Sequence, residues 1–141
     1  MTDYPVRILV LCTGNSCRSQ MAEGFLRSLG NDQVEVHSAG LAPTELNPRA
    51  VVVMAEAGID ISGHTSKALD GFLYQEFDYV ITVCANAAAN CPFFPGGGVR
   101  LHWPFDDPAE FRGSDEEIMA GFRRVRDEIK ARVERWLRTV A

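Results

Sequence analysis

Hydrophobic and polar positions follow two alternating patterns along the chain, one typical of buried β-strands and one typical of amphipathic helices. Residues 7–11 form a short apolar run that ends at a polar turn, as a parallel strand buried on both faces does. Residues 34–39 and 79–83 are further strand-like segments, and residues 100–103 are a weaker one. The pattern therefore predicts four strands.

Three helices are expected between and after these strands. The first begins at Ser19 and has Gly30 where a helix C-cap belongs. The second follows Asn47 and Pro48, which suit the N-cap and first helical positions. The third is long, starts near Ser114, and has apolar residues at steps of three and four: Ile118, Phe122, Val125, Ile129, Val133, Trp136 and Val140.

Strands that alternate with helices predict an α/β fold, in which a four-stranded parallel sheet carries helices on both faces. The 141 residues suffice for one hydrophobic core without disulfide support. We therefore expect a single domain over residues 1–141.

Net charge and cysteine content limit the partners and the cellular location that we expect. The net charge of −5 argues against nucleic acid or an anionic membrane as a partner. No apolar stretch is long enough to span a bilayer, and residues 1–5 do not look like a secretion signal, so we expect a cytoplasmic protein. Four cysteines there favour reduced thiols used for chemistry over structural disulfides.

The most informative segment joins the first strand to the first helix. It has Cys12 at one end and Arg18 at the other, and the residues between and after them are Thr13, Gly14, Asn15, Ser16, Cys17 and Ser19. Such a loop can turn its backbone N–H groups toward a tetrahedral oxyanion, aided by the helix N-terminus and the arginine. The same field favours the thiolate of Cys12, which makes this residue a candidate nucleophile. Cys17 has no necessary role in this chemistry beyond its place in the loop.

A second cysteine pair, Cys84 and Cys91, follows the third strand with six residues between its members. Zinc sites use two closer pairs, so a metal is a poor interpretation. A pair of resolving thiols in a redox cycle fits better. The Ala-rich segment between them is expected to move during such a cycle.

The segment from Val10 to Gly24 closely resembles the phosphate-binding loop of low-molecular-weight tyrosine phosphatases and their arsenate reductase relatives, and residues 19–24 are closer to the reductases. The resemblance extends to residues 38–40, 58–66 and 105–109, and so covers most of the chain.

The resemblance implies the strand order 2-1-3-4, which brings Cys84 near Cys12. It also implies that Asp107, immediately before Pro108, is the acid that protonates the leaving group, whereas Asp106 is a turn or capping residue. In the thioredoxin-coupled arsenate reductases a cysteine pair lies at this position and is followed by proline, as in Cys91-Pro92.

The implied function is reduction of arsenate to arsenite by a relay of Cys12, Cys84 and Cys91, with thioredoxin as the electron donor and phosphate and sulfate as competing oxyanions. Glutaredoxin or another thiol system is an alternative donor. A tyrosine phosphatase would need only Cys12, Arg18 and Asp107, but phosphatases of this family usually have aromatic residues where this chain has Ala109 and Glu110. A weak phosphatase side activity is still expected. A non-catalytic module that binds oxyanion or arsenite is the third interpretation.

No cofactor or metal site is expected. The three histidines, His37, His64 and His102, lack ligand spacing and are assigned structural roles. Some reductases of the family hold potassium at positions matching Asn15, Glu23 and Ser38, with an aspartate where this chain has Lys67. We predict that the lysine ammonium supplies the charge of that ion.

Overall fold

The computed structural model describes residues 5–92, 94 and 97–140. Residues 1–4, which were compared with a secretion signal above, lie outside this range. Its centre is a sheet of four parallel strands in the order β2-β1-β3-β4. The strands are β1 (Val6–Cys12), β2 (Val34–Gly40), β3 (Tyr79–Thr82) and β4 (Val99–His102). The predicted strands, their parallel pairing and the order 2-1-3-4 are confirmed.

Strand β1 lies in the middle of the sheet because its apolar run has no polar face. Residues 8–11 are fully buried, and β1 pairs with β2 on one side and β3 on the other. The register places Cys12 beside Gly40 and Leu11 beside Thr82. Cys12 and the segment after β3 therefore emerge at the same edge of the sheet, where parallel α/β folds bind their ligands.

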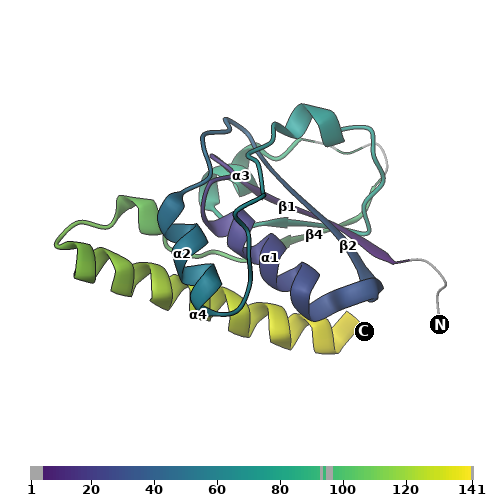
Figure 1. The fold of residues 1–141 in the computed structure, drawn as a ribbon. Helices are drawn as coiled ribbons and strands as arrows, with labels where there is room; N and C mark the ends of the chain where they lie inside the picture. The colour runs from purple at the N-terminus through teal and green to yellow at the C-terminus, as the bar shows by residue number, and fades with distance from the viewer. Residues whose placement is uncertain (1–4, 93, 95–96, 141) are drawn as a thin grey trace.

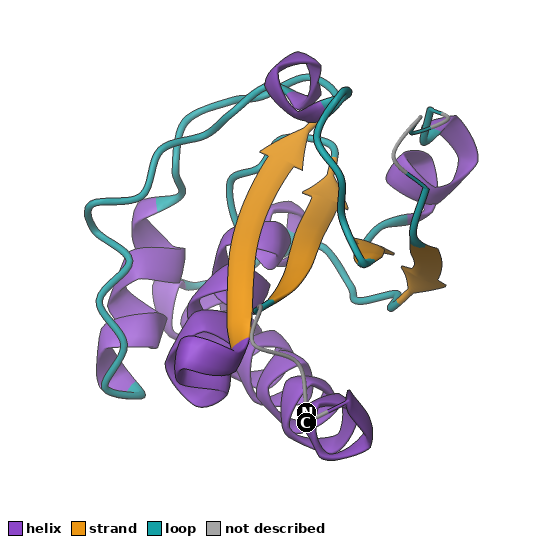
Figure 2. Ribbon diagram, turned by 90° about the vertical axis from the view of Figure 1, so that its right-hand side faces the viewer, coloured by secondary structure: helices purple, strands orange, loops and turns teal. Residues whose placement is uncertain are grey.

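Three helices pack together along one face of the sheet: α1 (Arg18–Gly30), α2 (Pro48–Glu56) and α4 (Asp115–Val140) (Figure 1). In α2 the Asn47 side chain accepts the backbone N–H of Arg49 at 2.9 Å, which confirms the predicted cap. The 3-10 helix η2 (Leu69–Phe72) lies beyond the ends of the strands in Figure 2. The rings of Phe72 and Phe77 contact the ring of His37.

The end of α1 differs from the prediction. Gly30 is still helical, and the positive φ of 50° falls on Asn31, which opens the 3-10 turn η1 (Asn31–Gln33). Gly30 is needed for another reason, because a Cβ at this position would lie 2.5 Å from the Val34 side chain. The chain turns tightly here into β2, and only glycine leaves room for that approach.

A helix that was not predicted lies between Cys84 and Cys91, namely α3 (Ala85–Asn90). Alanine has the highest helix propensity, and four of the six residues are alanine. Cys84 is the N-cap and accepts the backbone N–H of Ala87 at its Sγ, 3.3 Å away. The helix lies at the edge of the sheet where β1 and β3 end.

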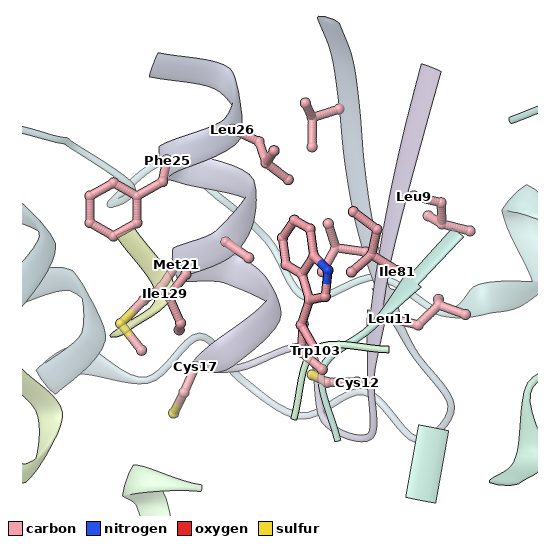
Figure 3. Packing of buried hydrophobic residues seen from close by; sticks show 14 of the residues in the cluster. Leu9, Leu11, Cys12, Cys17, Met21, Phe25, Leu26, Ile81, Trp103 and Ile129 are labelled. Carbon is pink, nitrogen blue, oxygen red and sulfur yellow. The ribbon is translucent and has the colours of Figure 1, made fainter. Parts of the chain in front are cut away.

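The core lies between the sheet and the α1 and α4 helices. Figure 3 shows Phe25 and Leu26 of α1 and Ile129 of α4 among its buried side chains. Trp103, directly after the weak fourth strand, is only 2% exposed. Cys12 and Cys17 lie at one end of this packed region, so the candidate nucleophile Cys12 is held by the hydrophobic core.

Candidate active site

The loop after β1 is built as a nest for an anion. The carbonyls of Cys12, Thr13, Gly14 and Ser16 accept the backbone N–H groups of Leu41, Ala42, Thr44 and Asn47 at 3.2, 2.9, 2.8 and 3.0 Å. These carbonyls therefore face outward, toward residues 41–47. A peptide N–H points away from its carbonyl, so the loop amides turn toward the inside, where they can bind an oxyanion.

Close approach between the loop and β2 makes Gly40 essential. A Cβ on Gly40 would lie 2.5 Å from the carbonyl oxygen of Thr13 and 3.0 Å from the backbone nitrogen of Asn15. The glycine thus lets β2 support the loop from below.

Asn15 holds the loop in shape from a fully buried position with a φ of 49°. Its Oδ1 accepts the backbone N–H of Lys67 at 2.8 Å, which fixes the orientation of the amide because a backbone N–H can only donate. Nδ2 therefore donates to the hydroxyls of Ser19 and Ser38, both at 2.9 Å. Gln20 adds a bond from its Nε2 to the Asn15 carbonyl at 3.0 Å.

This network directs two donors at the Cys12 sulfur. The Ser38 hydroxyl uses its hydrogen on Glu23, 2.6 Å away, and accepts from Asn15. Ser19 also accepts from Asn15, so its own hydrogen is free for Cys12 Sγ at 2.8 Å. The backbone N–H of Asn15 donates to the same sulfur at 3.1 Å. Both bonds stabilise a thiolate.

Arg18 and Asp107 form an ion pair in the wall of an open cavity. Nη2 of Arg18 lies 3.4 Å from Asp107 Oδ2, and Nη1 donates to the carbonyl of Phe105 at 3.1 Å. The cavity measures about 550 Å³ and is lined by Thr13, Arg18, Cys84, Ala85, Asn86, Pro104, Phe105, Asp106, Asp107 and Glu110. Cys12 lies just beneath this lining, 3% exposed.

The capping role expected of Asp106 belongs to Asp107 in the structure. Asp107 caps the 3-10 helix η3 (Pro108–Glu110) through a bond from the backbone N–H of Ala109 at 3.0 Å. Asp106 caps nothing in this segment and instead pairs with Arg124 of α4 at 3.2 Å. One Asp107 oxygen is thus fixed by the cap, which leaves the other facing Arg18.

Cys84 belongs to the same cavity, and Cys91 does not. Cys84 is 5% exposed, and its Sγ lies 3.4 Å from the hydroxyl of Thr13. Cys91 sits half-buried at the far end of α3, where Arg100 donates to its carbonyl at 3.5 Å. Burial raises the pKa of the Cys91 thiol above its ordinary value, and the charge of Arg100 opposes this.

Cys17 is inert by its surroundings. It is 2% exposed, and burial raises the pKa of its thiol to about 11. It therefore stays protonated at neutral pH, in keeping with its assignment as a bystander within the loop.

Behind the loop, Lys67 approaches the buried carboxylate of Glu23. Its Nζ lies 3.9 Å from Glu23 Oε1 and donates to the carbonyl of Thr65 at 2.6 Å. Arg27 pairs with the other oxygen at 3.1 Å. Asn15 Oδ1 is already occupied by Lys67 N–H. With its oxygens engaged and an ammonium beside them, this set does not fit a potassium ion.

The histidines stand outside the reacting groups. His64 Nδ1 lies 3.0 Å from Gln20 Oε1 and 3.6 Å from Glu23, and burial lowers the pKa of the imidazole. His102 bonds Thr82 at 2.8 Å. Within the residues that the structure describes, no group of three or more His, Cys, Asp and Glu side chains could hold a metal ion.

Three contributors to the site were not found by sequence reasoning. Gln20 supports Asn15, Asn86 lies over Thr13, and the carbonyl of Phe105 orients Arg18. Gln20 stood within the quoted motif and could have been found there. A backbone carbonyl leaves no signal in the sequence.

Comparison with known proteins agrees with this geometry. The family model of the low molecular weight phosphotyrosine protein phosphatases matches residues 7–141. The chain belongs to this family. Among its relatives, an arsenate reductase of Halalkalibacterium halodurans is 52% identical over 132 residues, which cover 94% of this chain and 95% of the relative.

The solved structures that this chain resembles include arsenate reductases. One, an arsenate reductase in the phosphate binding state, is 35% identical with a TM-score of 0.82 and covers 96% of this chain and 99% of its own. A thioredoxin-dependent arsenate reductase of Corynebacterium glutamicum is 29% identical with a TM-score of 0.73, over 96% of this chain and 62% of its own. None of the helices described here is long and apolar enough to cross a membrane.

Proposed function

We propose that the protein is an arsenate reductase that uses Cys12, Cys84 and Cys91 in sequence. The observation that carries the proposal is the presence of a second buried thiol, Cys84, in the wall of the cavity that holds Arg18 and Asp107. Hydrolysis of a phosphate ester requires one nucleophile and water, whereas reduction of arsenate requires two electrons. Two thiols that meet at one oxyanion site supply them.

In the first step the Cys12 thiolate attacks arsenic and forms a sulfur–arsenic bond, while one arsenate oxygen leaves as water. Asp107 gives the proton for this departure, because its Oδ2 lies beside Arg18 in the lining of the cavity. Arg18 and the inward amides of residues 13–18 hold the remaining oxygens. The developing charge is thus met by donors that are already in place.

In the second step the Cys84 thiolate attacks the Cys12 sulfur. The sulfur–arsenic bond breaks, its electron pair passes to arsenic, and arsenite leaves as a Cys12–Cys84 disulfide forms. In the third step the Cys91 thiolate attacks Cys84 and releases the Cys12 thiolate, which leaves a Cys84–Cys91 disulfide. A dithiol donor reduces that disulfide and completes the cycle.

The third step requires α3 to open. Cys84 and Cys91 cap opposite ends of the helix, and seven residues of helix extend about 10 Å. A disulfide needs Cα atoms within about 7 Å of each other. The chain between the two cysteines must therefore leave its helical form before the bond can close.

We further propose thioredoxin as the donor and the cytoplasm as the location. The pair of exchangeable cysteines suits a dithiol reductant, and the thioredoxin-dependent relative from Corynebacterium glutamicum supports this choice. The four cysteines are all free thiols, the form that a reducing compartment maintains.

A coupled assay tests the function. Arsenate is added to the protein with thioredoxin, thioredoxin reductase and NADPH, and NADPH oxidation is followed beside hydrolysis of p-nitrophenyl phosphate. We expect arsenate-dependent oxidation and slow hydrolysis. Hydrolysis without any arsenate-dependent oxidation would instead identify a phosphatase, and arsenate binding with neither activity would identify a binding module.

The order of the thiols can be tested by trapping. After one exposure of the Cys91→Ser variant to arsenate, peptide mass mapping should find a Cys12–Cys84 disulfide and one equivalent of arsenite. Arsenite released while both of these thiols remain free would refute the relay.

A further inference from the structure

A line of hydrogen bonds runs from α3 to the sulfur of Cys84. Asn90 Nδ2 donates to the side-chain oxygen of Asn86 at 2.9 Å and to the Asn86 carbonyl at 3.0 Å. Asn86 Nδ2 donates to the Thr13 hydroxyl at 2.8 Å. The Thr13 oxygen lies 3.4 Å from Cys84 Sγ. Four residues thus link the helix surface to the second thiol.

The direction of the bonds that Asn90 and Asn86 donate is determined. The Asn86 carbonyl can only accept, so Asn90 must present its NH₂ group to it. That NH₂ group also faces the Asn86 side chain, which must therefore present its oxygen to Asn90 and its own NH₂ group to Thr13. The Thr13 hydroxyl accepts from Asn86, and its single hydrogen remains available for Cys84.

We propose that Asn86, oriented by Asn90, is a positioning residue that holds the Thr13 hydroxyl as a hydrogen donor to Cys84. The inference rests on the proposed function, in which Cys84 is the second nucleophile. A thiolate can only accept, so a hydroxyl fixed in the donor orientation favours the thiolate over the thiol. Asn86 thereby prepares Cys84 to attack the Cys12 sulfur.

The arrangement also makes the reactivity of Cys84 depend on the folded helix. Asn86 and Asn90 are one helical turn apart, and their bond exists only while α3 is wound. When α3 opens for the third step, Thr13 loses its orienting partner. The Cys84 thiolate is therefore stabilised in the reduced protein, where Cys84 must attack the Cys12 sulfur. This stabilisation is absent once the Cys84–Cys91 disulfide has formed.

Two nearly isosteric variants separate this role from a general helix effect. Asn86→Leu removes both donor and acceptor, so the Thr13 hydroxyl turns freely. Asn86→Asp places an acceptor against Thr13 and draws its hydrogen away from Cys84. Asn86 is exposed, so neither change disturbs the core. Ala89→Asp adds the same charge at another exposed position of α3 and serves as the control.

The measurement is alkylation of Cys84 by iodoacetamide in the reduced protein over a pH series, resolved by peptide mass spectrometry with Cys12 as internal reference. At neutral pH, Asn86→Leu should slow the Cys84 reaction roughly three- to tenfold, the value of one hydrogen bond. Its pH midpoint should move upward. Asn86→Asp should show a larger change, and Ala89→Asp should match the original protein.

Wild-type profiles in both Asn86 variants, or the same shift in Ala89→Asp as in Asn86→Asp, would overturn the inference even if the protein reduces arsenate. The expected shifts in a protein without arsenate turnover would leave the hydrogen-bond direction established and would refute the proposed function instead. The two ideas can therefore fail separately.

Discussion

The anion loop, residues 12–19, and the α3 segment, residues 84–91, both present thiols to one cavity, but they are built in opposite ways. In the loop, Cys12, Asn15, Cys17 and Ser19 are buried, and several loop carbonyls accept hydrogen bonds from residues 41–47. The Asn15 side chain bonds to Lys67 through its oxygen and to Ser38 through its nitrogen. The α3 helix has six residues, of which only Ala87 is buried. The anion loop is thus held in place by many contacts, whereas α3 has few contacts that oppose its unwinding.

This difference matches the chemistry required of each. Binding and attack on an oxyanion depend on donors that are in place in advance, because any rearrangement would add to the barrier. Transfer of a disulfide between partners at opposite ends of a helix depends on movement. In the proposed mechanism the molecule therefore combines a rigid site for arsenate with a short helix that opens for disulfide exchange.

Removal of the groups in the rigid region should have the largest effect. Cys12→Ser and Arg18→Ala should each lower arsenate reduction and p-nitrophenyl phosphate hydrolysis together, by about a thousandfold or more for the nucleophile. Steady-state kinetics of both reactions measure this. Full reductase activity in Cys12→Ser would contradict the assignment of the site.

A small addition beneath the loop should break its rigidity. The Cβ in Gly40→Ala would lie 2.5 Å from the Thr13 carbonyl, and such overpacking costs about 1–3 kcal/mol of the free energy of unfolding. A displacement of the loop should lower both activities about a hundredfold. Gly63→Ala is the control, since nothing lies within 4 Å of its new Cβ. Equal kinetics in the two variants would show that the loop does not need the close approach.

The movable region should respond to pH through Cys91. Burial raises the pKa of this thiol, so its thiolate fraction at neutral pH is small and should rise about tenfold per pH unit until the pKa is reached. Conversion of the Cys12–Cys84 disulfide to Cys84–Cys91 should accelerate accordingly. Quenched single-turnover samples can follow it, with Cys91→Ser as the blank. A rate that does not change with pH would place the limiting step in the opening of α3.

Weakening of α3 should speed that same conversion by a smaller factor. Ala88→Gly, at an exposed helix position, destabilises the helix by about 1 kcal/mol, which corresponds to about fivefold more of the open form. Starting from the preformed Cys12–Cys84 disulfide, the exchange should be about fivefold faster. Ala131→Gly makes the same change at an exposed position of α4 and should leave the rate of disulfide exchange unaltered.

The smallest effect is expected behind the rigid loop. Lys67 Nζ lies 3.9 Å from Glu23, so the lysine supplies the positive charge that a potassium ion would otherwise bring. Reductase rates in potassium and sodium salts of equal ionic strength should therefore agree. A marked activation that saturates with potassium alone would show that an ion site survives beside the lysine.

Much of the rigid region could be predicted from the sequence. The apolar run before Cys12 predicts a buried central strand, and Asn47-Pro48 predicts a helix start that the structure reproduces. These signals are local and strong, since strand and helix periodicity and capping chemistry depend on neighbouring residues. The loop itself was recognised because Cys12 and Arg18 stand between a strand and a helix.

The movable region could be predicted less well. Helix α3 was not predicted because six residues give too short a pattern, although its alanines favour a helix. The separate roles of Asp106 and Asp107 depend on Arg124 and Arg18, which are distant in sequence. The bond from Asn86 to Thr13 joins positions 73 residues apart. Such contacts are set by the tertiary fold rather than by any local pattern.

The N-cap of α3 has a consequence for the timing of the cycle. The acceptor that begins this helix is the Cys84 sulfur itself, and a charged thiolate is a much stronger acceptor than a sulfur in a disulfide. Once Cys84 has bonded to Cys12, the helix loses most of the capping energy, which is about 1 kcal/mol for an ordinary cap. Oxidation of Cys84 Sγ thus destabilises α3 at the step in which Cys91 must leave the end of the helix. The stability of α3 therefore depends on the redox state of Cys84.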